Sequence, residues 1–402
     1  MKTFISRLNY FYIAFTLFWV PLQQTVLAID GLGRIPIVIT IFVFVINYLL
    51  DKNFKFLIIS NPFLFWGIWI IYSIINLFLK GYLGEIPLFY FFGLKLLIPF
   101  VVMLITAKEA MRSPAKVTKY LLYMFLLYAL FYFFMLTGDM NFSKTGHRSF
   151  NLIGNIGTLT VIYVMFFASI LYITKKLSLT KLIMMIIFTL LIVVLTATRK
   201  AFGASLIMIV MLIFSQFKLK PKNVFIICLL GIGLNFAVDV ILENTLLGAR
   251  FDLGVADGEE RNTTDFKALR LLGDRAFFYI SAWEVFVNNL YTGVGLGNFR
   301  HETNTRLLLH SEYLVHLAEG GILGTSLFLA FNMWFGKNLL RARKNLKYRP
   351  LIYVMIGAFI SILFINLTAW TYEFGHYFIV FGLMSAYIKR SNNSMPRKPL
   401  SR

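Results

Sequence analysis

The sequence has few charged residues and almost no cysteine. Charged residues make up 14% of its 402 positions, whereas a soluble domain carries roughly 25%. The single cysteine, Cys228, lies inside an apolar run, which excludes an intramolecular disulfide and a cysteine-based metal site. The five histidines are scattered, and no Asp-x-Asp or His-Glu-x-x-His motif occurs. We therefore predict neither a metal centre nor a cofactor.

Long apolar runs, by contrast, dominate the chain. Hydrophobic residues make up 59% of it, and the mean hydropathy is +0.75. A helix that crosses a bilayer needs roughly 20 apolar residues. The runs predict an all-α polytopic membrane protein with about twelve transmembrane helices, at residues 8–29, 34–50, 56–79, 86–106, 117–137, 150–174, 181–198, 201–217, 223–243, 313–336, 351–368 and 370–388.

The basic residues test this topology independently. The net charge is +21, but Lys and Arg stand in short clusters between apolar runs rather than in one patch, so nucleic acid is not predicted as a partner. With the N-terminus inside, 25 of the 39 Lys and Arg fall in inner segments and 13 in outer segments. Because inner segments are enriched in basic residues, both termini are predicted to be cytoplasmic.

The N-terminal segment also imitates a cleaved secretory signal. Lys2 and Arg7 precede an apolar run that ends in Val26-Leu27-Ala28, and this pattern is typical of such signals. The predicted topology needs the same segment as its first span. We therefore expect the segment to be retained.

One outer segment breaks the pattern of short connections. Residues 244–312 lie between the ninth and tenth spans, and a connection this long is usually functional or a small domain. Amphipathic patterns at 265–272 and 277–288 predict that it is partly helical. The predicted division is a transmembrane bundle (1–243), a periplasmic loop subdomain (244–312), the rest of the bundle (313–390) and a cytoplasmic tail (391–402).

Three glycines in this loop alternate with other residues. Gly293, Gly295 and Gly297 have the spacing G-x-G-x-G, and no βαβ unit surrounds them, so they do not form a dinucleotide-binding fingerprint. We favour a tight turn with positive φ angles. A close backbone approach to a phosphate is the weaker alternative.

Polar residues crowd the point where the loop re-enters the membrane. His310 by default is an interfacial packing residue, but histidine is also suited to general-base work at neutral pH. Glu312, His316 and Glu319 are spaced four and three residues apart, so they share one face of a helix. Such residues are costly at the mouth of a span and are often functional there. A structural hydrogen-bonded cluster is an equally weighted interpretation.

Basic residues also stand where the topology disfavours them. Arg199 and Lys200 lie in a tight outer hairpin, and the guanidinium group of arginine suits bidentate phosphate binding. Snorkelling anchors are the alternative. Lys95 lies inside a span and is a further candidate, although a carbonyl contact would satisfy it equally well. With Arg275 and His310 in the loop, these residues predict a basic outer-face site for an anionic, lipid-linked substrate.

Three motifs follow one another along the chain. Thr-Arg-Lys-Ala ends the 196–201 hairpin element, and Arg275 precedes an amphipathic helix and Gly-Val-Gly-Leu-Gly-Asn-Phe at 293–299. Residues 310–324 read His-Ser-Glu-Tyr-Leu…Glu-Gly-Gly-Ile-Leu-Gly. This pattern resembles the O-antigen polymerase and O-antigen ligase superfamily of bacterial membrane glycosyltransferases, whose own elements are Ser-Arg-Thr and His-Asn-x-x-Leu…Glu-x-Gly-x-x-Gly. Ser311 replaces the commoner Asn.

The resemblance implies metal-independent glycosyl transfer from an undecaprenyl-pyrophosphate-linked glycan at the outer leaflet of the bacterial inner membrane. It implies that Arg199 and Arg275 hold the pyrophosphate and that His310 activates the acceptor hydroxyl, with inversion at the anomeric carbon. Lys200, Glu312, His316, Glu319, Gly295, Gly297 and Lys95 are expected to support the site. The implied partners are the lipid-linked glycan, a glycan or lipid A core acceptor and membrane lipids, and a chain-length regulator protein is compatible with them.

The sequence leaves three functions open. A polymerase joins one lipid-linked repeat unit to another, and we favour it because polymerases are numerous and divergent. A ligase transfers the glycan to lipid A core and shares the same motifs. A lipid-linked glycan transporter or flippase should place paired charges near the bilayer midplane, often in two related halves. Lys95 is nearly alone at such a depth.

Overall fold

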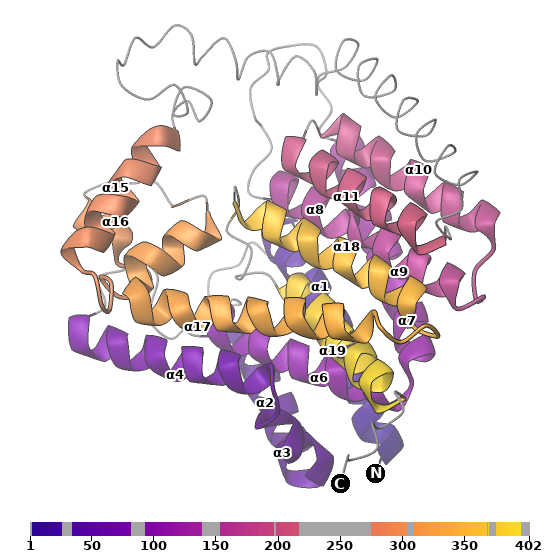
Figure 1. The fold of residues 1–402 in the computed structure, drawn as a ribbon, viewed down its shortest axis with the longest axis horizontal. Helices are drawn as coiled ribbons and strands as arrows, with labels where there is room; N and C mark the ends of the chain where they lie inside the picture. Colours follow the sequence, from indigo (N-terminus) through magenta and orange to yellow (C-terminus); the bar gives the residue numbers. More distant parts are fainter. Residues whose placement is uncertain are drawn as a thin grey trace, which may run out of the picture.

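The structure is a computed structural model that describes residues 2–25, 34–81, 93–138, 153–196, 198–216, 275–303, 309, 311–367, 369 and 375–394. Every regular element in these ranges is helical (Figure 1). The elements are α1 (Lys2–Thr25), α2 (Ile35–Leu50), α3 (Lys52–Ile58), α4 (Phe63–Lys80), the π-helix η2 (Gly93–Leu97), α6 (Ile98–Arg112), α7 (Pro114–Gly138), α8 (Ile153–Val161), α9 (Tyr163–Ile173), α10 (Leu179–Leu195), α11 (Arg199–Gln216), α15 (Arg275–Asn288), α16 (Phe299–Glu302), α17 (Glu312–Ala342), α18 (Arg349–Asn366) and α19 (Gly375–Asn393).

Five of the described helices are long and apolar enough to cross a membrane: α4, the Pro114–Phe134 part of α7, α11, α17 and α18. The pair α2 and α3, bent by 114°, adds a sixth if it counts as one span, and Gly157–Ile173 and α10 are shorter apolar helices. The all-α membrane class is confirmed, while the number of twelve spans stays a prediction. The ninth predicted span, 223–243, and the amphipathic pattern at 265–272 lie outside the described residues.

Closely packed helix pairs form the middle of the molecule, and α6 and α19 are almost wholly buried there. α6 packs along α19, and α11 packs along α18. Glycines permit these close contacts: a Cβ on Gly382 of α19 would lie 2.5 Å from the carbonyl oxygen of Met103 in α6, and one on Gly357 of α18 would lie 2.8 Å from Cβ of Met211 in α11. Small residues at helix contacts are typical of membrane bundles, where packing rather than water drives association.

Peripheral helices turn apolar side chains outward. On α4, Ile71, Ile75 and Phe78 are exposed, whereas Trp69 and Asn76 on the opposite face are buried. A helix on the surface of a soluble protein has the reverse arrangement, with its apolar stripe toward the core. The outward apolar face of α4 is therefore suited to contact with lipid.

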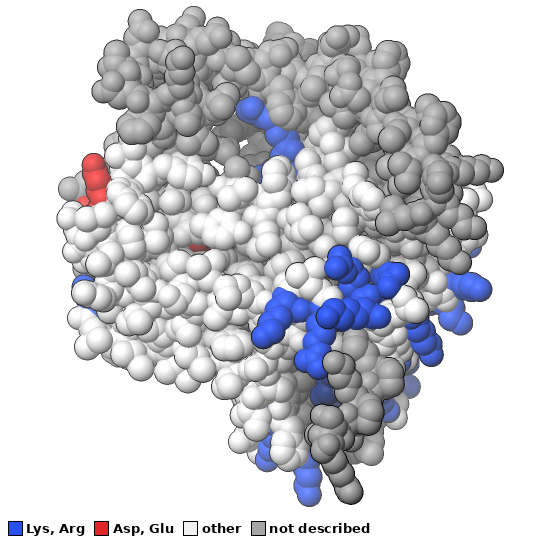
Figure 2. All heavy atoms as spheres, viewed as in Figure 1, with Lys and Arg blue, Asp and Glu red and all other residues white. Residues whose placement is uncertain are grey.

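Basic side chains gather at one part of the surface (Figure 2, blue). The connection from the end of α17 to the start of α18 carries exposed cations, namely Arg341, Arg343, Lys344, Lys347 and Arg349. This connection is one of the segments predicted to be cytoplasmic. The orientation of the termini and the division at 243, 312 and 390 stay predictions.

Helix α17 is not one straight span. Gly321 inside it has φ 60° and ψ −161°, which is not helical. The rings of His316 and Phe328 stack with centroids 4.0 Å apart, and those of Tyr313 and Phe328 lie 5.7 Å apart. In a continuous helix twelve residues rise about 18 Å. The segment 312–320 therefore folds back on 322–342 (Figure 1, orange), and the predicted span 313–336 is interrupted at Gly321.

Candidate functional site

The glycine-rich turn of the loop lies against the break in α17. A helix that stops leaves backbone carbonyl and amide groups without helical partners. Here Val294 N donates to Ala318 O at 3.1 Å, and Gly295 N donates to Glu319 O at 3.0 Å. Across the break, Ile322 N donates to Leu290 O at 2.9 Å. The turn thus satisfies backbone groups on both sides of Gly321.

The glycines of the turn have the backbone that the sequence predicted. Gly293, Gly295 and Gly297 have φ angles of 66°, 92° and 86°, so the predicted tight turn with positive φ is confirmed. A Cβ on Gly293 would lie 2.4 Å from the carbonyl carbon of Glu319, and one on Gly321 would lie 2.5 Å from Gly293 N. The glycine turn and the break in α17 can therefore approach this closely only because Gly293 and Gly321 lack side chains.

Glu319 fixes the turn through its side chain. The residue is buried. Its Oε2 accepts a hydrogen bond from Gly297 N at 2.8 Å, and its Oε1 accepts one from Phe299 N at 3.4 Å. A carboxylate that accepts backbone amide hydrogen bonds is held firmly. In the described contacts Glu319 therefore supports the loop, which agrees with the structural interpretation of this residue.

Helix α4 holds the same junction from the other side. Tyr72 Oη donates to Gly320 O at 2.6 Å. Asn76 Nδ2 donates to Thr292 O at 2.7 Å and to Glu319 O at 3.3 Å. We call Tyr72 and Asn76 the α4 clamp. The sequence analysis missed both residues, although two polar side chains four apart on an apolar helix face are a signal that could have found them.

Glu312 and His316 form a second contact on the short arm of α17. His316 Nε2 lies 3.2 Å from Glu312 Oε1. The side chain of His316 is only 1% exposed and that of Glu312 only 2%. The His316 ring also makes an edge contact with Trp69 of α4, with centroids 5.1 Å apart. The predicted common helix face of Glu312 and His316 is confirmed. The burial of both side chains suits them to position neighbouring residues.

His310 lies outside the described residues. The residues on either side of it are described, and both are buried. Ser311, which replaces the commoner Asn of the motif, donates from Oγ to Asn366 O at the end of α18, at 3.3 Å. The start of α17 is therefore tied to α18 next to position 310.

The hairpin with Arg199 and Lys200 is as short as predicted. α10 ends at Leu195 and α11 begins at Arg199. Both basic residues thus stand in the first turn of a helix, with Arg199 exposed and Lys200 partly buried. The helix dipole makes this end positive, which disfavours cations and attracts anions. The two cations and the positive helix end together form a basic site that suits an anionic ligand.

Two other predicted site residues, Arg275 and Lys95, are described by their backbone alone. Arg275 is the first residue of α15, and Lys95 lies in the π-helix η2. The side chains of Arg275 and Lys95 are outside the described part of the structure. What the structure does bring together is the glycine turn, the break in α17 and the α4 clamp. The predicted amphipathic helix at 277–288 is confirmed by α15.

A family model described as O-antigen ligase matches residues 182–329. Over this segment the chain is similar to the O-antigen polymerase and ligase superfamily. The match begins in α10 and ends in the long arm of α17, so it includes the hairpin, α15, the glycine turn and the break at Gly321. No curated protein matches the chain.

The family match indicates the general character of the chain. The match supports a multi-pass membrane protein and an enzyme of the membrane glycosyltransferase type. It covers less than half of the chain, and the α4 clamp lies outside it. The clamp residues Tyr72 and Asn76 nevertheless contact the matched segment directly, through Thr292, Glu319 and Gly320.

Proposed function

We propose that the protein polymerises undecaprenyl-pyrophosphate-linked oligosaccharide repeat units into O-antigen, capsular or exopolysaccharide at the outer face of the bacterial inner membrane. The observation that carries the proposal is the pair of cations, Arg199 and Lys200, in the first turn of α11 within the matched segment. An anionic ligand at this helix end would be attracted by both cations and by the positive end of the helix dipole. A pyrophosphate that leaves with a negative charge is such a ligand.

The proposed reaction is one displacement at the anomeric carbon. A hydroxyl oxygen of the acceptor glycan bonds to that carbon, and the carbon–oxygen bond to the pyrophosphate breaks with inversion. The electron pair of that bond leaves on the polyprenyl pyrophosphate, where Arg199 and Arg275 stabilise the developing charge. His310 takes the proton of the acceptor hydroxyl, and general-base catalysis of this kind contributes roughly 10²–10⁴-fold.

The break in α17 has a clear part in this proposal. His310 stands two residues before α17, and Ser311 ties the start of the helix to α18. The short arm 312–320 is in turn held by the glycine turn and the α4 clamp. Residues on one rigid support keep a general base in a fixed geometry better than a free loop does. We therefore assign Glu312, His316 and Glu319 the role of positioning the arm that carries His310.

A second function, transfer of the glycan to lipid A core, is favoured by the description of the matching family model, which is that of O-antigen ligases. The two functions differ in the acceptor. The purified protein is incubated with an undecaprenyl-pyrophosphate oligosaccharide, with and without lipid A core. The proposal predicts longer lipid-linked chains without lipid A core, and product formation only in its presence would instead establish the ligase.

A further inference from the structure

Helix α15 has three distinct faces along its length. One face is buried against α17 and the neighbouring loop, and it includes Phe278, Ser281, Ala282, Val285 and Phe286. A second face is apolar and exposed: Ile280, Trp283 and Val287 are 47%, 58% and 53% exposed. A third face is polar and exposed, and it carries Glu284 and Asn288. At 100° per residue the apolar and polar exposed faces are neighbours that do not overlap.

The exposed apolar face continues beyond the end of the helix. Leu290 and Tyr291 follow it, and Tyr291 is 72% exposed. Leu290 O accepts from Ile322 N, and Tyr291 O accepts from Leu323 N at 3.2 Å. Ile322 and Leu323 are themselves exposed and begin the long arm of α17, which is part of a candidate membrane span. The apolar face of α15 is therefore continuous with the surface of a spanning helix.

The end of α4 lies beside the same junction. The α4 clamp binds Thr292 O directly after Tyr291. The last turn of α4 carries the exposed apolar residues Phe78 and Leu79, followed by Lys80. The apolar face of α15 thus meets two spanning helices where one of them ends. A spanning helix ends at the level of the lipid headgroups, and Trp and Tyr are enriched at this level.

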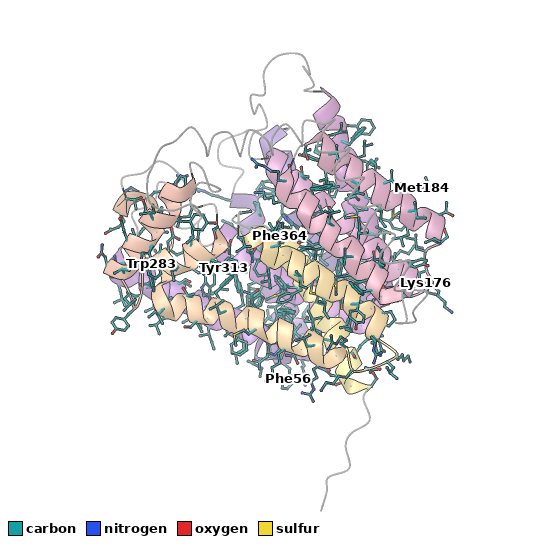
Figure 3. The ribbon with its side chains drawn as sticks, turned by 45° about the horizontal axis from the view of Figure 1, so that its top comes forward. Phe56, Lys176, Met184, Trp283, Tyr313 and Phe364 are labelled. Carbon is teal, nitrogen blue, oxygen red and sulfur yellow. The ribbon has the colours of Figure 1, made fainter. Side chains whose placement is uncertain are left out.

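We propose that the face formed by Ile280, Trp283, Val287 and Tyr291 is a membrane-contact surface, and that α15 lies in the interfacial layer of the bilayer. Its partner is the lipid itself: acyl chains meet the apolar face, and water meets Glu284 and Asn288. Figure 3 shows Trp283 at the edge of the molecule, on the side away from Tyr313. No charged residue interrupts the apolar face, and an amphipathic helix with aromatic and aliphatic residues on one side is typical of interfacial anchors.

If the proposed function holds, an interfacial α15 has a further consequence. Arg275 begins α15, so the helix brings that residue to the depth of a lipid-linked pyrophosphate. A substrate carried by a polyprenyl lipid presents its pyrophosphate among the headgroups. The helix would thus set the height of the arginine relative to the membrane, and the membrane contact itself needs no substrate.

The test uses spin labels on single cysteines in a chain from which Cys228 has been removed by Cys228→Ser. Labels are placed by Trp283→Cys and Val287→Cys on the apolar face, and by Glu284→Cys and Asn288→Cys as matched controls on the polar face. The protein is reconstituted in nanodiscs of phosphatidylethanolamine and phosphatidylglycerol. Collision with oxygen, which partitions into lipid, is compared with collision with a water-soluble nickel complex.

The proposal expects the labels at 283 and 287 to collide severalfold more with oxygen than with the nickel complex, and the labels at 284 and 288 to show the reverse. Equal collision ratios at all four positions would overturn it, because the helix would then lie in water. Labels at 283 and 287 that are shielded from both reagents would also overturn it and would assign the face to a second copy of the chain. The experiment contains no glycan, so failure of the proposed enzymatic function does not change its outcome.

Discussion

At Gly321 the backbone takes φ 60° and ψ −161°, a region that is essentially restricted to glycine. The residue has a second reason to be glycine, because a Cβ there would lie 2.6 Å from Thr292 N and the same distance from the carbonyl carbon of Tyr291. Gly320, its neighbour, meets only ordinary contacts, with the nearest atom 3.8 Å from an added Cβ. Adjacent glycines in the same motif therefore have different physical roles.

Gly321→Ala should destabilise the protein, because both the backbone and the crossing with the glycine turn oppose a side chain. A strained non-glycine residue of this kind costs about 1–3 kcal/mol before any steric clash is added. Thermal unfolding in detergent measures the effect, with Gly320→Ala as the matched control that is expected to unfold near the wild-type temperature. Equal unfolding temperatures for the two variants would show that neither the backbone conformation of Gly321 nor its close approach to the glycine turn requires glycine there.

Glu319 allows a second test at a single side chain. Glu319→Ala removes the acceptors of Gly297 N and Phe299 N, and leaving a buried donor unsatisfied costs about 1–3 kcal/mol. Glu319→Gln retains one oxygen that can accept from Gly297 N, so it should lose less stability than Glu319→Ala. The order of unfolding temperatures, wild type above Gln above Ala, is the expected result. A Gln variant less stable than the Ala variant would contradict the role of Glu319 as an acceptor.

At the scale of elements, α4 couples a spanning helix to the glycine turn. Asn76→Leu removes the hydrogen bonds from Nδ2 to Thr292 O and Glu319 O, each worth about 0.5–1.5 kcal/mol net. We expect lower glycosyl transfer together with a lower unfolding temperature, since the arm next to His310 loses a support. Ile75→Leu on the exposed face of α4 is the control and should change neither. Unchanged glycosyl transfer by Asn76→Leu would show that the α4 clamp does not support the site.

A second inter-element contact joins the connection between α2 and α3 to α6, far from the glycine turn in sequence. Lys108 Nζ lies 2.7 Å from Asp51 Oδ2. Burial of the Asp51 carboxyl opposes its ionisation, but the hydrogen bond and charge of Lys108, together with the backbone amides of Asn53 and Phe54, outweigh this effect. The pKa of Asp51 therefore lies below its ordinary value of 3.8. Ionised Asp51 therefore stabilises the fold above pH 3.8, and this contribution is lost as the pH falls through the lower folded-state pKa.

Asp51→Asn should accordingly unfold at a lower temperature than the wild type at neutral pH. The difference should be constant above about pH 5 and should shrink as the pH falls below the ordinary aspartate pKa. Unfolding temperatures in detergent between pH 3 and pH 7 measure it. A difference that stays the same at pH 3 would mean that Asp51 does not act through its charge.

At the scale of the whole molecule, the sequence predicted the helical membrane class, the short hairpin before α11 and the glycine turn, because each depends on local composition. It did not predict the fold-back of α17. Residues 312–324 have helical spacing throughout, and the reversal at Gly321 depends on contacts with Tyr291–Gly295 that no local pattern contains. The α4 clamp was missed for the same reason, since Tyr72 and Asn76 lie more than 200 positions from the segments they bind.

We propose that Arg199 and Arg275 hold a lipid-linked pyrophosphate while His310 accepts the proton of an acceptor hydroxyl. The most direct measurement is chain extension in cells that lack the chromosomal copy, complemented by Arg199→Ala, Arg275→Ala or His310→Ala, with the amount of each protein in the membrane as the control. The account predicts that each variant reaches wild-type membrane levels and makes no polymer. Wild-type polymer ladders from all three variants would contradict it.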